Sequence, residues 1–163
     1  MQPLRSLLGG ETTTVALFVD GPNVLREEFD VDLDDLRVAA EDLGQLAATR
    51  LYLDEHASPG LIQAAEARGF EVTVTSGDVD VKLAVDATEF ALTDGLDVLA
   101  VASRDTDFKP VLEKAAHNGV RTVAIAPGEY GRSDALRNAA HDAQVVDPDG
   151  NTEESGDSED SED

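Results

Sequence analysis

The sequence has 163 residues, enough for one domain with a buried core, and its apolar fraction of 41% is that of a globular protein. It contains no cysteine, which excludes disulfides and thiolate metal sites, and it has no apolar run of signal-peptide or membrane-span length, so we expect a soluble cytoplasmic protein. Acidic residues outnumber basic ones by 35 to 12, which gives a net charge of -23.

Part of this charge is local. The run that begins at Asp147 holds nine acids and no base, so we expect a disordered acidic tail over 148–163. Before it we expect a flexible leader over 1–12 and one domain over 13–147. The first 146 residues still carry 26 acids and 12 bases, and only three of the bases are lysines. Such a surface is typical of halophilic proteins, because salt near 1 M screens charge repulsion beyond roughly 3 Å.

Taken in chain order, β-rich runs alternate with helical ones. Strands are predicted at 14–19, 49–53, 70–75, 97–102 and 120–126, with 143–146 as a candidate edge strand. Helices are predicted near 33–43 after the N-cap Asp32, at 59–68 after Ser58, at 79–93, and from about 107 to 117, and Ser133 is expected to cap a short last helix. This alternation predicts an α/β three-layer sandwich with a mostly parallel sheet of about five strands, covered on both faces.

The helix predicted at 79–93 has several apolar residues that are available for packing. Val81, Val85 and Leu92, together with Ala84 and Ala91, are expected to contribute to the core.

Acidic residues follow three of the predicted strands. The first strand ends in Asp20-Gly21-Pro22-Asn23, the third in Ser76-Gly77-Asp78-Val79-Asp80 and the fourth in Ser103-Arg104-Asp105-Thr106-Asp107. If the first and fourth strands are neighbours, their carboxyl ends bring Asp20, Asp80, Asp105 and Asp107 together, with Asp78 near. When carboxylates lie so close together, their mutual repulsion makes it costly in free energy to ionise all of them. A bound Mg²⁺ or Mn²⁺ would offset that repulsion, and both ions prefer oxygen ligands.

Each acid also has an ordinary structural interpretation. Asp20 would fit a strand-end turn, and Asp80 or Asp107 would fit a helix N-cap, whereas Asp105 has no expected capping role. Asp86 follows Lys82 by four residues and is expected to form a helical ion pair on a different face from Asp80, so an ion pair is favoured over metal binding there. Asp86 and Asp78 are therefore only secondary ligand candidates.

Three motifs, VDGPN, GDVDVKLAVDA and SRDTDF, resemble those of the NYN domain, a branch of the PIN-like nuclease superfamily, over roughly residues 14–147. Within it, the chain is most similar to the archaeal LabA/DUF88-like branch. The resemblance implies a PIN-like sheet wrapped by helices and an acidic Mg²⁺ or Mn²⁺ site that cleaves RNA. It assigns catalysis and metal binding to Asp20, Asp80, Asp105 and Asp107. Asn23 and Ser103 match its polar positions and would orient water or substrate, and Arg104 is a candidate for the same task from its place in the chain alone.

The chain departs from the family pattern at two places. Gly77-Asp78-Val79-Asp80 stands where the family often has Lys-Gly-Val-Asp, and Arg104 stands where it often has glycine. Arg104 would meet developing negative charge or form a surface ion pair.

The function expected from these features is that of a metal-dependent ribonuclease. The alternative is a catalytically weak or inactive metal-binding or RNA-binding regulatory module on the same fold, which the missing basic cluster favours. A protein partner or homo-oligomer would then supply RNA contacts. A dinucleotide-binding domain is less favoured because G-x-G-x-x-G is missing, and an aspartyl phosphatase because no D-x-D follows the first strand.

Overall fold

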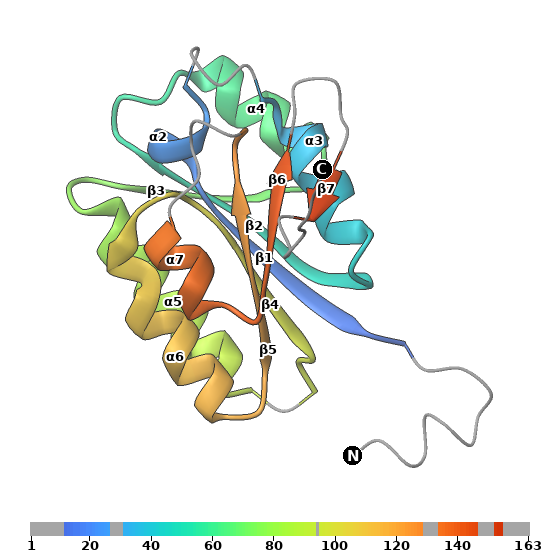
Figure 1. Ribbon diagram of the computed structural model, residues 1–163. Helices are drawn as coiled ribbons and strands as arrows, with labels where there is room; N and C mark the ends of the chain where they lie inside the picture. The colour runs from blue at the N-terminus through green and yellow to red at the C-terminus, as the bar shows by residue number, and fades with distance from the viewer. Residues whose placement is uncertain (1–11, 27–30, 94, 129–133, 147–151, 155–163) are drawn as a thin grey trace, which may run out of the picture.

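The computed structural model describes residues 12–26, 31–93, 95–128, 134–146 and 152–154 (Figure 1). Its strands are β1 (Thr14–Asp20), β2 (Gln45–Asp54), β3 (Glu71–Thr75), β4 (Val98–Ala102), β5 (Arg121–Ala126), β6 (Asp142–Val146) and β7 (Thr152–Glu154). Its helices are α2 (Gly21–Val24), α3 (Leu33–Glu41), α4 (Pro59–Ala67), α5 (Val79–Ala91), the 3₁₀ turn η2 (Thr106–Phe108), α6 (Lys109–His117) and α7 (Asp134–Ala139). Among the described helices, none is long and apolar enough to cross a bilayer.

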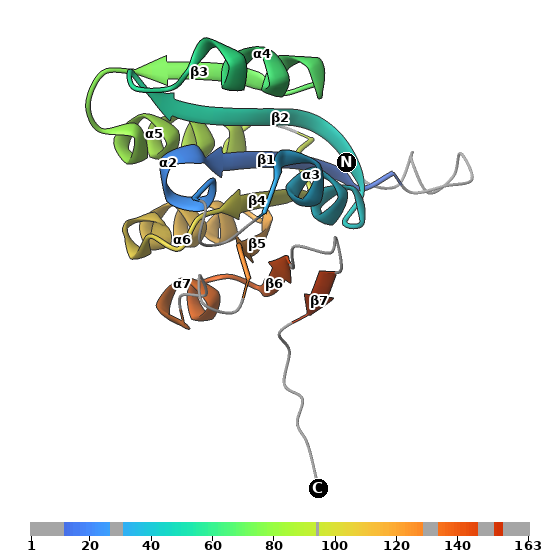
Figure 2. The same ribbon diagram turned by 90° about the horizontal axis from the view of Figure 1, so that it is seen from above.

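The strands form one sheet in the order β3-β2-β1-β4-β5-β6-β7, and Figure 2 shows them stacked in that order from edge to edge. The first six strands are parallel, and β7 runs antiparallel to β6. The prediction of a mostly parallel sheet is therefore confirmed, but the expected count of about five strands is too low. The candidate edge strand does form, as β6.

β7 lies inside the acidic segment that was expected to be a disordered tail. Residues 152–154 pair with β6, so for these three residues the expectation of disorder is wrong. The leader up to residue 11, the rest of the tail and Ser133, which was expected to cap the last helix, lie outside the described residues.

Helices cover both faces of the sheet (Figure 1). α3 and α4 pack on one face, where α3 lies against β1, with Val15 and Leu17 on this side, and α4 lies against β3. α5, α6 and α7 pack on the opposite face, where α5 lies against β1, with Ala16 and Phe18 on this side, and α6 and α7 lie against β5. β4 is buried along its whole length, as expected for a central parallel strand.

α5 buries a different stripe from the one expected. Its buried side chains, spaced by four residues, are those of Val79, Leu83, Ala87 and Ala91. Val81, Val85 and Leu92, expected in the core, are 56%, 59% and 48% exposed. Apolar residues lie on two sides of this helix, so periodicity alone did not determine which side would face the sheet.

Local capping follows the sequence closely in the first half of the chain. Asp32 accepts a hydrogen bond from the backbone N–H of Asp35 and forms a capping box with it, and Ser58 accepts from the N–H of Leu61. β2 begins four residues before the predicted strand. The helix predicted from about 107 begins as η2 and continues as α6.

α2, a single turn, was not predicted and follows β1 directly. Its first residue, Gly21, lies so close to β2 that a Cβ there would stand 2.6 Å from the backbone oxygen of Tyr52. Glycine therefore lets the chain turn tightly at the end of β1, beside the acidic residues.

Candidate metal centre

The acidic residues lie where the strand order reverses. β1 pairs with β2 on one side and with β4 on the other, and the chain continues outward from each of them. Asp20 is the last residue of β1, and Ser103 follows β4 directly. The condition on which the sequence argument depended, that the first and fourth strands are neighbours, is met. Ligands of open parallel sheets bind at this reversal, beyond the carboxyl ends of the strands.

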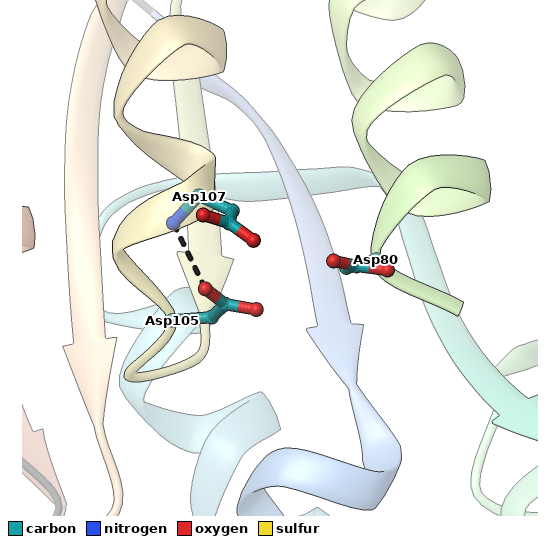
Figure 3. A group of neighbouring side chains, drawn as sticks. All are labelled: Asp80, Asp105 and Asp107. Atoms are coloured by element: carbon teal, nitrogen blue, oxygen red, sulfur yellow. Dashed lines mark hydrogen bonds between the residues drawn. The ribbon is translucent and has the colours of Figure 1, made fainter. Parts of the chain in front are cut away.

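Asp80, Asp105 and Asp107 form an acidic group, in which one carboxylate oxygen from each lies within 4.8 Å of the others. Asp80 belongs to the first turn of α5, and the other two come from the turn after β4 (Figure 3). The carboxylates of Asp105 and Asp107 face that of Asp80 across the gap between α5 and the turn.

Asp105 has a capping role that the sequence did not indicate. It is the N-cap of η2, and its Oδ1 accepts a hydrogen bond from the backbone N–H of Asp107 at 2.9 Å. The expectation that Asp105 lacked such a role is corrected, and the alternative interpretation of Asp107 as an N-cap is not met, because Asp105 takes that position. Asp80 is likewise not the N-cap of α5, because Asp78 takes that position.

Asp20 lies beside the acidic group but is not a member of it. Its side chain is only 4% exposed, and it accepts a hydrogen bond from the hydroxyl of Ser103 at 3.2 Å. Burial raises the pKa of Asp20 to about 6, and the charges of Asp105 and Asp80 add to the rise, against the lowering effect of the Ser103 hydrogen bond. The carboxylate therefore sits in a negative potential that a cation would relieve.

Ser103 and Asn23 hold the turn after β4 in place. The buried hydroxyl of Ser103 donates to Asp20 and accepts from the backbone N–H of Asp105 at 3.0 Å. Oδ1 of Asn23 accepts from the N–H of Arg104 at 2.9 Å. Both side chains, expected to orient water or substrate, thus make hydrogen bonds within the protein: Ser103 joins this turn to β1, and Asn23 joins it to α2. Arg104 itself is half-buried.

An open cleft of about 310 Å³ runs along these residues. Its acidic lining residues are Asp20, Asp54, Asp78, Asp80 and Asp105. Arg26 and Asn23 line it as well, and Asp107 lies outside it. Asp54 was missed by the sequence reading, although it ends β2, whose carboxyl end lies beside that of β1.

Asp86 is not brought to the acidic group. Its carboxylate accepts a hydrogen bond from the hydroxyl of Tyr52 at 2.7 Å and pairs with Lys82 at 3.2 Å, which is the ion pair that the spacing predicted. Burial, followed by the hydrogen bond to Asp86, raises the pKa of Tyr52 above its ordinary value. Asp86 therefore has a packing role between α5 and β2.

The donor set suits a hard divalent cation. All three members of the acidic group offer carboxylate oxygens, the ligands that Mg²⁺ and Mn²⁺ prefer. Two oxygens on opposite sides of one Mg²⁺ lie ~4.2 Å apart, so the 4.8 Å limit is close to direct coordination by a single ion.

Comparison with known proteins agrees with this geometry. The model of the NYN domain matches residues 14–147. An uncharacterized protein of Methanocaldococcus jannaschii, MJ0482, is 44% identical over 126 residues, which cover 77% of this chain and 52% of that protein, so the chain spans about half the length of this relative. A crystal structure of a protein of unknown function from Vibrio parahaemolyticus, VPA0982, shares the fold. Its TM-score is 0.71 at 22% identity, and the match covers 83% of this chain and 94% of the other.

Proposed function

The chain belongs to the NYN domain family, and on that premise we propose that it is a ribonuclease that depends on a divalent metal ion. The observation that carries the proposal is the group of Asp80, Asp105 and Asp107 at the reversal of strand order, with buried Asp20 beside it. A PIN-like nuclease needs such a set of oxygen ligands at this edge of the sheet, and family members generally cleave RNA.

In this proposal each acid has a separate task. Asp80, Asp105 and Asp107 hold the ion, and Asp20 contributes through its charge or through a bridging water. When bound, Mg²⁺ or Mn²⁺ would neutralise charge on the phosphoryl group and favour ionisation of the attacking water. Ser103 keeps Asp20 and Asp105 at a fixed separation through its two hydrogen bonds. Hydrolysis of this class would leave a 5′-phosphate and a 3′-hydroxyl.

The cleft also supports a second candidate, a metal-binding or RNA-binding regulatory module with little or no catalysis. Five acids and one arginine line the cleft, and Asp78 stands close to where the family often carries a lysine. RNA affinity normally comes from lysine and arginine contacts to phosphate, so this cleft alone would bind RNA weakly. A partner protein or a second copy of the chain would then supply the remaining contacts.

An RNA cleavage assay tests the first candidate. Purified protein is incubated with 5′-labelled RNA in 1 M KCl with Mn²⁺ or Mg²⁺, beside Asp20→Asn and Asp80→Asn, and Asp42→Asn serves as control because it removes an exposed acid from the end of α3. The wild type and the control should cut. The two site variants should lose at least about 100-fold in rate, since changes even in residues that only support metal ligands cost 10- to 100-fold.

Calorimetric titration with Mn²⁺ separates the two candidates. If the wild type binds Mn²⁺, Asp80→Asn weakens that binding, and the wild type does not cleave RNA, the result supports the regulatory module. Equal cleavage by all variants places the activity elsewhere or in a contaminant. If Mn²⁺ does not bind to the wild type, the ribonuclease and the metal-binding form of the module both fail, and only an RNA-binding module is left.

A further inference from the structure

Arg26 is the basic residue of the cleft that contains the proposed metal ligands. The cleft is lined by Asp80 and Asp105, two members of the acidic group, and Arg26 lines the same hollow. Within the described part of the chain, the other charged residues of the lining are all aspartates. Arg26 is exposed and follows the end of α2 by two positions. A ligand that is bound to an ion at the acidic group and extends along the cleft would therefore meet this guanidinium.

The cleft crosses the edge of the sheet and is lined from both faces. Val24, the last residue of α2, is buried in the core on the α3 side, whereas Val79, the first residue of α5, is buried in the core on the opposite side. Arg26 comes shortly after Val24, and Asp80 directly after Val79. The guanidinium and the carboxylates that would hold the ion thus reach the cleft from different layers of the fold. A bound strand of RNA would run from one layer to the other.

The charges of the cleft favour a phosphate at one place besides the ion. Asp54 and Asp78, near the ends of β2 and β3, would repel a phosphate on their side. The guanidinium of Arg26 attracts phosphate and can donate two parallel hydrogen bonds to its oxygens. None of the aromatic side chains in the described ranges lines the cleft, so the bases have no stacking platform there. RNA in this cleft would therefore be held through its backbone, at the ion and at Arg26.

We propose that Arg26 binds a phosphate of the RNA that neighbours the one at the metal ion, and so sets where the strand lies in the cleft. The proposal rests on RNA being the ligand of this cleft, as in the proposed function. Two simpler roles of Arg26 give different results in the experiments below. One is support for the shape of the acidic group, and the other is a general balance of the negative charge of the cleft.

Fluorescence anisotropy with a labelled oligouridine tests the contact. Asp80→Asn, which should not cut, is compared with the double variant Asp80→Asn/Arg26→Gln in Mn²⁺ and KCl from about 0.3 to about 1 M. At the lowest salt the dissociation constant should rise about 10-fold in the double variant. The slope of log affinity against log salt should fall by about 0.7, as expected for one phosphate contact to a single strand.

Arg121→Gln in the same background is the control for the loss of one positive charge. Arg121 is exposed and begins β5, at the opposite edge of the sheet from the cleft. This control should change the RNA affinity by less than about twofold, since a contact with the bound strand is what the proposal assigns to Arg26 alone of the two.

A second experiment locates the phosphate. The wild type and Arg26→Gln are incubated with 5′-labelled RNAs that each carry one uncharged methylphosphonate linkage, and the product lengths give the position of each cut relative to it. Besides the modified linkage itself, cuts at one fixed offset from it should be suppressed about 10-fold in the wild type, because Arg26 loses its charged partner there. Arg26→Gln should lose this dependence on offset. A general effect of charge in the cleft would slow the cuts at all offsets alike.

Calorimetric titration with Mn²⁺ separates the phosphate contact from support of the acidic group. The Mn²⁺ affinity of Arg26→Gln should not fall, because a guanidinium repels a divalent cation, whereas a supporting role would weaken the binding of both RNA and metal. Circular dichroism shows whether the variant is folded, and Arg26→Met, which keeps most of the apolar stem, replaces it if it is not.

The results decide this proposal separately from ribonuclease activity. Equal RNA affinities of the Arg26→Gln and Arg121→Gln variants, a parallel fall in Mn²⁺ affinity, or no RNA binding at all would overturn it. Cleavage by the wild type with the same offset pattern in Arg26→Gln would also overturn it and leave the ribonuclease intact. RNA binding that needs Arg26, in a wild type that does not cut, would remove the ribonuclease and keep the phosphate contact in an RNA-binding module.

Discussion

Replacement of Asp20 by asparagine should stabilise the metal-free protein at neutral pH. Burial raises the pKa of this carboxyl from 3.8 to about 6, so between these values the folded state binds more protons than the unfolded state. Folding stability contributed by the protonated carboxyl is therefore lost as the pH rises from about 4 to about 6, and the loss is complete above that range. The pKa difference of about 2 corresponds to about 3 kcal/mol. The amide still accepts from Ser103, but through a weaker bond, so we expect a net gain of about 1–3 kcal/mol above pH 7.

Thermal unfolding in EDTA and 1 M KCl, from pH 4 to pH 8, measures this gain. For a chain of this size, 1 kcal/mol corresponds to about 2–4 °C in Tm, so Asp20→Asn should melt about 2–12 °C above the wild type at pH 7.5 and level with it near pH 4. Asp42→Asn controls for the loss of one charge from a very acidic chain. A variant that melts no higher than wild type at pH 7.5, or whose advantage does not change with pH, would refute the argument that burial of the charge is costly. Added Mn²⁺ should narrow or reverse this difference, because the wild type, which keeps the charge of Asp20 beside the three ligands, should bind the ion more tightly than the variant.

Two further substitutions test the scaffold of the site. Ser103→Ala removes the donor to Asp20 and the acceptor for the N–H of Asp105, so the free energy of unfolding should fall by about 1–3 kcal/mol. Mn²⁺ affinity, measured by calorimetry, should fall by about 10- to 100-fold. A change in affinity below threefold would contradict the positioning role of Ser103. Gly21→Ala would place a Cβ 2.6 Å from a backbone oxygen of β2 and should cost about 2–3 kcal/mol in urea unfolding, whereas Gly60→Ala, with open space around it in α4, should cost nothing. Equal effects of the two alanines would show that the close approach at Gly21 is not tight.

The parallel sheet and the meeting of the acids could be predicted from the sequence because both depend on short-range patterns. Apolar runs separated by helix-length segments imply parallel strands, and the carboxyl ends of parallel strands lie at one edge. Asp20 and Asp105 are 85 positions apart and still lie near each other, because β1 and β4 are neighbours, and Asp80 faces Asp105 because α5 packs beside η2 and α6. The same logic, applied to the end of β2, would have found Asp54.

The features that the sequence did not determine depend on long-range packing. α5 has apolar residues on two sides, and only its contact with the sheet decides that Leu83 is buried and Val85 exposed. β7 forms from a polar segment because β6 offers it a free edge, and strand propensity alone would not select Thr152–Glu154. The roles of Ser103 and Asn23 required the register between β1 and β4.

The structural and the metal-binding interpretations of these acids do not exclude each other, because a carboxylate has two oxygens. Oδ1 of Asp105 accepts from the N–H of Asp107, and Oδ1 of Asp80 accepts from the N–H of Val81. Each side chain keeps a second oxygen, and a carboxylate accepts about four hydrogen bonds or metal contacts in all. The capping bond fixes the rotation of the side chain, which lowers the entropy lost when an ion binds. A capping role for Asp105 thus supports the proposed metal centre, since the hydrogen bond that caps the start of η2 also aims the remaining oxygen at Asp80.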